Sequence, residues 1–195
     1  MAPHDRSIPR SGAMFSRASL AKADLATNLA IPLLAEGGWA ALTLRAMAHA
    51  SHVTPQAIAA WFPSVAAMQA AVAGRYGDRW IAERSYLARR RLLELQPAQT
   101  TPDAVVAALL PQSRLEEVFD GVWLTILEAS RWDDGLGAAV AHVLAREKEV
   151  VHDLVSTSQD PGPVLEQVRG VRAARVVHTQ IAAGRPSENT SGSAG

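Results

Sequence analysis

The feature that most constrains the fold is a pair of helix-start signals between Leu42 and Ser64. Thr43 precedes one helical segment and Thr54 precedes the next, and each threonine hydroxyl can accept a hydrogen bond from a backbone N–H one turn into its helix. Pro55 suits the first helical position, where a missing N–H costs nothing. We therefore expect two short helices joined by a tight turn, the second over about residues 54–61.

The apolar residues of this segment fit a helix-turn-helix. The first helix has an apolar side with i, i+3, i+4 spacing, made of Leu44, Met47 and Ala48. The second helix is expected to bury Ala57, Ile58, Trp61 and Phe62 and to end at Pro63. Val53 is expected to point inward from the turn.

The run EGGWxxLTLRxMAxAxxVTxxxIxxxFPS, residues 36–64, resembles the DNA-binding domain of the tetracycline-repressor (TetR) family. The resemblance covers about residues 20–72. It implies an all-α protein with a three-helix helix-turn-helix domain (19–66) and a helical ligand-binding and dimerisation domain (67–185). An N-terminal arm (1–18) and a polar tail (186–195) flank them. The implied protein is a homodimeric transcriptional repressor that a small hydrophobic or aromatic ligand releases from operator DNA.

The resemblance also implies which residues contact double-stranded DNA. Thr43 and Arg45 are expected to meet phosphates at the start of their helix, and Ser64 is expected to bind another phosphate. Gln56 is expected to recognise an adenine through its amide. The groove-facing side of the third helix is expected to present Thr54, Pro55, Gln56, Ala57, Ala60 and Trp61.

Three positions depart from the family pattern. Ala59 stands where the family usually has Tyr, Trp61 where it has His or Tyr, and Val65 where it has Lys. Because these positions contact phosphates in the family, we expect weaker DNA binding with a flatter salt dependence. Arg45 is the only charged residue between Leu42 and Ser64. The alternative function is therefore a TetR-fold ligand-binding or interaction module in which DNA binding is weakened or lost.

The remaining sequence has helical periodicity. A first helix is expected over 19–36, kinked or starting late because of Pro32, and a long helix over 65–95. The apolar sides of 136–155 and 164–181 are expected to pair with a second copy in a four-helix interface. A ligand cavity is expected between helices, lined by Trp80, Phe119, Trp123, Leu127 and Trp132. The alternative for these aromatic residues is ordinary core packing.

Composition excludes several classes of function. The chain has no cysteine, so disulfides, thiol catalysis and cysteine-ligated zinc are excluded. The histidines lack the spacing of a metal site, and Asp133 and Asp134 adjoin Gly135 as turn residues do. We therefore expect no enzyme, no metal and no cofactor. No apolar stretch reaches membrane-spanning length and no signal peptide is evident, so we expect a cytoplasmic protein without a membrane partner.

Charge is distributed unevenly along the chain. Residues 1–95 carry 11 Lys and Arg against 6 Asp and Glu, although the whole chain has a formal net charge of zero. A basic first half suits an end that faces phosphates. Most of these arginines follow the helix-turn-helix, however, and the alternative is that they only solvate a long helix.

Overall fold

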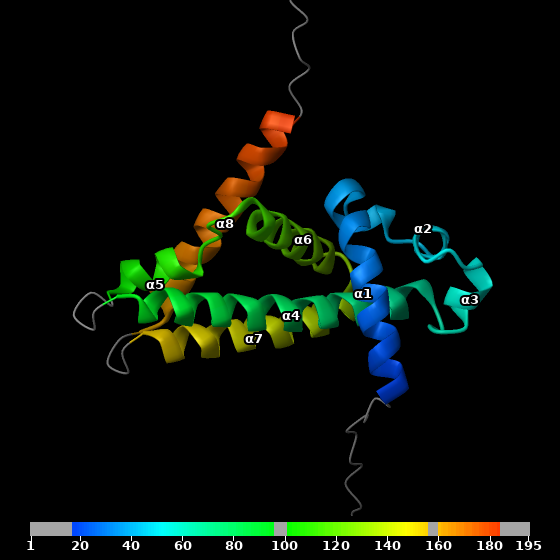
Figure 1. Ribbon diagram of the computed structural model, residues 1–195, viewed down its shortest axis with the longest axis horizontal. Coiled ribbons are helices and arrows are strands. Elements are labelled where there is room, and N and C mark those ends of the chain that lie inside the picture. Colours follow the sequence, from blue (N-terminus) through cyan, green and yellow to red (C-terminus); the bar gives the residue numbers. More distant parts are fainter. Residues whose placement is uncertain (1–16, 96–100, 156–159, 184–195) are drawn as a thin grey trace, which may run out of the picture.

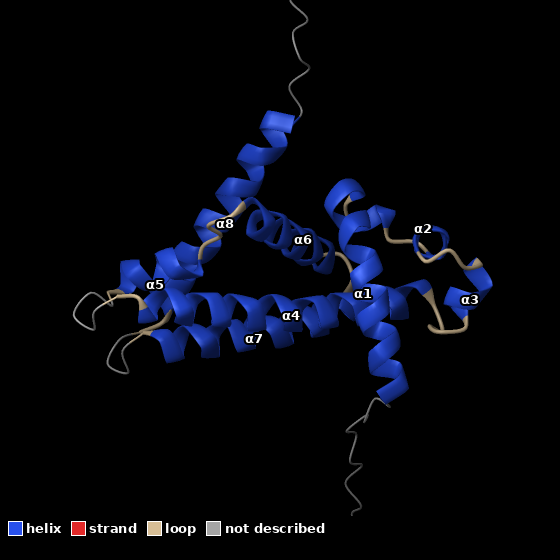
Figure 2. Cartoon of the chain, viewed as in Figure 1, coloured by secondary structure: helices blue, strands red, loops and turns tan. Residues whose placement is uncertain are grey.

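The computed structural model describes residues 17–95, 101–155 and 160–183, with side chains over 21–95, 101–155 and 160–175. Within these ranges the chain forms eight α-helices and one short 3-10 helix, and no strand, as expected for an all-α fold (Figure 2). The elements are α1 (Arg17–Gly37), η1 (Trp39–Ala41), α2 (Leu44–Ala50), α3 (Pro55–Ala59), α4 (Val65–Leu93), α5 (Pro102–Leu109), α6 (Arg114–Ser130), α7 (Asp134–Leu154) and α8 (Gly162–Ala183). The expected tail and most of the expected N-terminal arm lie outside the described residues.

Helix α4 is the long central helix of the molecule (Figure 1). Helix α7 runs along it, α1 crosses it, and α2 and α3 lie at its N-terminal end, whereas α5 and the start of α8 lie at its C-terminal end. One hydrophobic core runs from the α1–α3 domain along α4, α6 and α7, and a second joins α4, α5, α7 and α8. The long fourth helix therefore belongs to both halves of the protein.

The predicted helix starts are confirmed. Thr43 Oγ1 accepts a hydrogen bond from the Ala46 N–H at 3.1 Å, and Thr54 Oγ1 accepts one from the Ala57 N–H at 3.3 Å. Ser64 Oγ caps α4 in the same way, at 3.0 Å from the Ala67 N–H. Helix α3 itself is short, and it ends two residues before the predicted boundary. Each cap supplies a partner for an N–H that the helix leaves unpaired.

One expectation for the N-terminal domain was wrong. Val53 does not point inward: its side chain is 40% exposed. The core of this domain contains Leu42, Met47 and Ile58, each fully buried. Of the two alternatives that Pro32 raised, the late start is not seen, because α1 runs continuously from Arg17 through Pro32, whose side chain is exposed.

Gly77 marks the closest approach of three helices. A Cβ atom at this position would lie 2.5 Å from Val143 Cγ2 on α7 and 2.9 Å from Trp123 Cζ3 on α6. Real Cβ atoms do not approach other atoms that closely, so the absence of a side chain lets α4, α6 and α7 pack together. The glycine weakens α4 as a helix but permits the core.

Candidate DNA-binding surface and ligand cavity

The residues expected to contact DNA lie on α2, α3 and their flanking turns, at one end of the molecule (Figure 1). Most of them are exposed, namely Thr43, Arg45, Thr54, Pro55, Gln56, Ala60 and Ser64. Ala57 is half-buried. Trp61 is also half-buried and packs against the core, so less of its ring is available to a partner than the sequence suggested. The three hydroxyl residues Thr43, Thr54 and Ser64 also cap their helices.

The arginines of α4 nearest this end bind the protein's own first helix. Arg75 forms a two-point hydrogen-bonded ion pair with Asp24 of α1, and the hydrogen bond from Arg75 lowers the pKa of that carboxyl. Arg79 donates a hydrogen bond to Asn28, also on α1. The positive charge after the helix-turn-helix thus holds α1 against α4, and it does more than solvate a long helix.

The aromatic residues of the rear domain form a packed core. Trp80 and Trp123 are each 2% exposed, and their rings stack with centroids 5.1 Å apart. Tyr76 stacks on Phe119 at 6.1 Å and donates a hydrogen bond to the Phe119 carbonyl at 2.7 Å. This packing corresponds to the alternative raised from the sequence, in which the rings fill the core.

The expected five-residue ligand site is therefore not assembled as predicted. Trp132 is 83% exposed, because α6 ends at Ser130 and leaves this residue in the following turn. Phe119 and Trp80 line none of the main cavities of the described residues. Trp123 and Leu127 do share a cavity of about 300 Å³ between α6, α7 and α8, together with Leu144.

A cluster of buried charges surrounds the Trp80 ring. Arg84, Asp120, Glu147 and Arg172 are each at most 5% exposed. The Trp80 indole N–H donates to Asp120 Oδ1 at 2.9 Å, and the Arg172 guanidinium lies 4.8 Å from the centre of the Trp80 ring. Stacking of a cation on an indole adds attraction in a desolvated site. This cluster was not predicted from the sequence.

Asp120 lies at the centre of the cluster. Its Oδ1 is 3.0 Å from Arg84 Nη2 and its Oδ2 is 3.2 Å from Arg172 Nε. Arg172 also donates to Glu147 Oε1 at 2.8 Å and to the Leu109 carbonyl at 2.9 Å. Burial lowers the pKa of Arg172, and the charges of Asp120 and Glu147 oppose that effect. The cluster ties α4, α6, α7 and α8 together.

Further ion pairs extend the cluster toward α5. Glu116 accepts hydrogen bonds from Arg84 at 2.7 Å and from Arg91 at 2.8 Å. Burial favours the neutral form of Glu116, but the hydrogen bond and charge of Arg91, with the charge of Arg84, outweigh it and lower the pKa. Arg91 also donates to the carbonyls of Ala108 and Leu110 at 2.7 and 3.1 Å.

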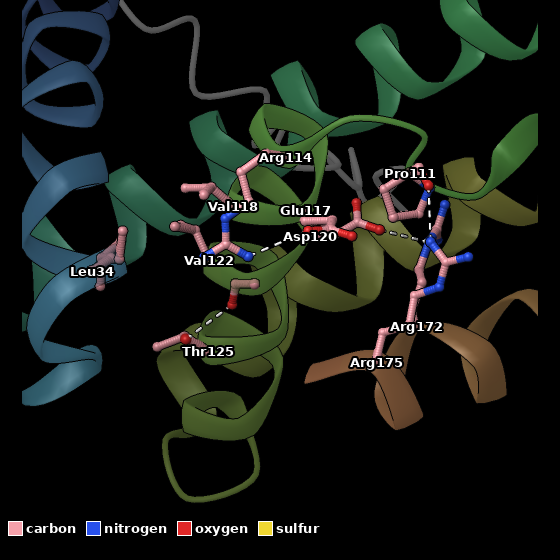
Figure 3. A pocket seen from close by; sticks show the side chains of 12 residues that line it. Leu34, Pro111, Arg114, Glu117, Val118, Asp120, Val122, Thr125, Arg172 and Arg175 are labelled. Carbon is pink, nitrogen blue, oxygen red and sulfur yellow. Dashed lines mark hydrogen bonds and ion pairs between the residues drawn. The ribbon is translucent and has the colours of Figure 1, made fainter. Parts of the chain in front are cut away.

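A cavity of about 210 Å³ opens beside Asp120 and Arg172 (Figure 3). It lies between the C-terminal part of α1, the α5–α6 connection, α6 and α8. The residues that line it are Leu34, Ala35, Pro111, Arg114, Glu117, Val118, Asp120, Gly121, Val122, Thr125, Arg172 and Arg175. Because Leu34 and Ala35 belong to α1, the cavity adjoins the helix-turn-helix domain as well as the rear domain.

The described residues offer little support for other classes of site. They contain no group of three or more His, Asp or Glu side chains placed to hold a metal ion. A further groove of about 590 Å³ lies between α1, α4 and the Trp61–Pro63 turn, and five of its twelve lining residues are alanines. None of the described helices is both long enough and apolar enough to span a lipid bilayer.

Comparison with known proteins identifies the fold. No family model matches the sequence, and no curated protein matches it. A transcriptional regulator from Rhodococcus sp. Rha1 has a similar structure, with a TM-score of 0.63 and 16% sequence identity over 82% of this chain and 86% of that chain. A protein from Rhodococcus sp. assigned to the TetR family of transcriptional regulators gives a TM-score of 0.60 and 15% identity, over 80% of this chain and 88% of that chain. The chain therefore has the fold of the TetR-family regulators, as the sequence resemblance implied.

Proposed function

We propose that the protein is a TetR-type transcriptional regulator, which binds operator DNA as a homodimer in the cytoplasm and releases it when a small molecule binds. The observation that carries this proposal is the exposed Thr54–Pro55–Gln56 end of α3, set on a TetR-type fold. An exposed helix end in a helix-turn-helix is the part that enters a DNA major groove.

Each exposed residue then has a separate role at the DNA. Gln56 is the best candidate for recognising a base, because its amide presents a donor and an acceptor to the edge of an adenine. Arg45 and the first N–H groups of α2 face phosphates, which fix the position of the protein without carrying base identity.

The proposed dimer interface is formed by α7 and α8. It is supported by a different observation from the apolar pattern that suggested it in the sequence. The apolar side of α7 is occupied within the chain, since Leu136, Val140, Val143 and Val151 are buried. The apolar side that was expected to pair with a second copy is therefore used in the core of the chain itself. What supports the dimer is α8, whose last turns project beyond the rest of the described chain (Figure 1). A second copy would supply neighbours for these turns in a closed two-fold assembly.

Ligand control is proposed through the cavity beside Asp120. Its walls come from α1 on one side and from α6 and α8 on the other. A molecule that binds more tightly to one arrangement of these helices shifts the population toward it. Because α1 carries the helix-turn-helix, such a shift changes the spacing of the two α3 helices in a dimer.

The experiment is a gel shift at low salt with the DNA that flanks the protein's own gene, using wild type, Arg45→Ala and Gln56→Ala. Wild type is expected to bind and both variants to bind less well. The scarcity of charge between Leu42 and Ser64 specifically favours the alternative of a TetR-fold module without DNA binding. Absence of any shift for the wild type at low salt would establish that alternative.

A further inference from the structure

The cavity between α1, α6 and α8 is lined by two buried charged residues, each of which has one polar atom whose hydrogen-bonding capacity is unused. Among the described residues, neither Asp120 Oδ2 nor Arg172 Nε has a hydrogen-bond partner. The two atoms are 3.2 Å apart and attract one another as an ion pair, but their alignment does not make a hydrogen bond. Both residues line the cavity, where their side chains face one another (Figure 3). Buried polar atoms without partners are uncommon in folded proteins, and each one is a candidate position for a bound group.

The chemistry of this pair defines the group that fits it. Asp120 Oδ2 requires a hydrogen-bond donor, and Arg172 Nε–H requires an acceptor. A carboxamide presents an N–H and a C=O side by side on one edge, so it satisfies both. A carboxylate offers acceptors only and meets the charge of Asp120, whereas an amine meets the charge of Arg172.

The size and walls of the cavity define the rest of the molecule. The volume of this cavity, about 210 Å³, is larger than that of an engineered apolar protein cavity of ~150 Å³ that binds benzene. The apolar side chains of Leu34, Val118 and Val122 line the same space. A single ring therefore fits against these side chains while a polar substituent reaches Asp120 and Arg172.

We propose that this cavity binds a neutral single-ring molecule that carries a carboxamide, or the equivalent N–H and C=O edge of a ring lactam. The inference rests on the proposed function and deepens it, because it names the chemical class of the regulating ligand. Because both atoms are buried, the Asp120 and Arg172 side chains turn slightly toward the cavity on binding, and the polar edge donates to Oδ2 and accepts from Nε–H while the ion contact is kept. Since Arg172 attaches α8 to α6 and Leu34 belongs to α1, the same molecule contacts the DNA-binding domain and the helix proposed for dimerisation.

The test uses the full chain without DNA and three probes of the same shape: benzamide, benzoate and toluene. The readout is the indole N–H resonance of Trp80 in nitrogen-15 NMR, because that group donates to Asp120 Oδ1 at 2.9 Å. Benzamide is expected to shift this resonance with a Kd of about 1 mM, the order expected for a ligand of this size. Benzoate and toluene are expected to bind at least about ten times more weakly, because each leaves a buried atom unpaired.

A matched pair of variants locates the binding. Gly121 lines the cavity, and a Cβ atom built there meets nothing within 4 Å among the described residues, so Gly121→Leu fills the cavity without a clash at its first atom. Gly137→Leu on α7 is the control, since its Cβ is equally free and lies outside this cavity. Gly121→Leu is expected to weaken benzamide binding at least about tenfold, and Gly137→Leu is expected to leave it unchanged.

Three results would overturn the inference: no benzamide binding to the wild type, equal binding of benzoate, or unchanged binding to Gly121→Leu. The probe comparison needs no variant, so it decides the matter even if Gly121→Leu does not fold. Operator binding is measured separately by gel shift. Probe failure with intact operator binding removes this inference alone, whereas probe binding without operator binding supports the site and contradicts the proposed regulator.

Discussion

Between Leu42 and Ser64 the only charged side chain is that of Arg45, which is exposed, whereas the other half of the molecule buries Arg84, Asp120, Glu147 and Arg172. The domain expected to face a polyanion is thus poor in charge, and the domain expected to be an apolar bundle is held together by charge. Among the described residues, most of the arginines that make the first half of the sequence basic act within the fold, as Arg75 does with Asp24 and Arg84 with Asp120.

This contrast shows why net charge along a sequence is a poor guide to a nucleic-acid surface. A buried ion pair contributes little field outside the protein, because each charge is neutralised at contact distance. If the protein binds DNA, specificity must then come from a few groove contacts and from helix-end N–H groups, with only a small contribution from phosphate charge. Four changes test this difference between the two regions, from the largest expected effect to the smallest.

Removing Asp120 should have the largest effect. Asp120→Ala leaves Arg84 and Arg172 buried without their shared partner, and breaking a buried pair in this way costs about 3–5 kcal/mol. The free energy of unfolding, measured by urea denaturation, should fall by that amount. The matched control is Asp153→Ala, which removes the exposed ion pair with Arg89 and should cost less than about 1 kcal/mol. Equal losses for the two variants would show that the buried cluster does not stabilise the rear domain.

Adding a methyl group at Gly77 should have the next largest effect. Gly77→Ala places a methyl group 2.5 Å from Val143 Cγ2, and overpacking of this kind costs about 1–3 kcal/mol even though alanine favours a helix. Gly137→Ala, where a Cβ meets no described atom within 4 Å, should instead stabilise the protein by up to about 1 kcal/mol. Thermal unfolding of the two variants tests the packing of α4, α6 and α7, and stabilisation by Gly77→Ala would contradict it.

The helix-turn-helix end, proposed to bind DNA, should respond to substitution in two distinct ways. Gln56→Ala should relax the preference at one base position by about 1–3 kcal/mol, since one bidentate contact is lost. Arg45→Ala should weaken binding to all sequences alike, because phosphates carry no base identity. Binding to a set of single-base operator variants measures both. If Gln56→Ala weakened binding to all operator variants equally, the Gln56 side chain would contact the phosphate backbone of the DNA and not a base in the groove.

Acidification should act on the rear domain with the smallest effect. The pKa of Glu116 is lowered in the folded protein below its ordinary value of 4.5, so this group contributes stability above that value and loses it as pH falls through the folded pKa. Glu116→Gln should therefore be less stable than wild type at neutral pH and lose less stability on acidification below about pH 4.5. Unfolding curves at several acidic pH values test this, and parallel losses in both proteins would contradict the assignment.

The sequence predicted those structural features that depend only on residues close together in the chain. The caps at Thr43 and Thr54 each involve an N–H three residues away, so local pattern was enough to find them. Val53 and Trp132 were misplaced because an apolar residue type does not reveal whether the space beside it is already filled or whether the helix has ended. The roles of Arg45 on α2 and Gln56 on α3 in DNA binding stay predictions.

The burial of these charged residues can be recognised from their positions in the apolar pattern of the sequence. The apolar series of α4, with a residue every fourth position, passes through Trp80 and continues at Arg84. In the same way Glu147 lies four residues after Val143, and Arg172 lies four residues after Val168. A charge that continues an apolar stripe must be buried and therefore paired. Which charge pairs with which could not be predicted, because Arg172 and Asp120 are brought together only by the packing of α6 against α8.

The salt dependence of operator binding tests the central claim most directly, namely that this protein binds DNA through few phosphate contacts because its charges are used inside the fold. For about four contacts per dimer, the logarithm of the binding constant should fall with a slope of about −4 against the logarithm of salt concentration. A slope of about −8 or steeper would contradict the claim, since it requires phosphate contacts from residues assigned here to internal pairs or lying outside the described residues. A complete lack of binding at the lowest salt would contradict the proposed regulator itself.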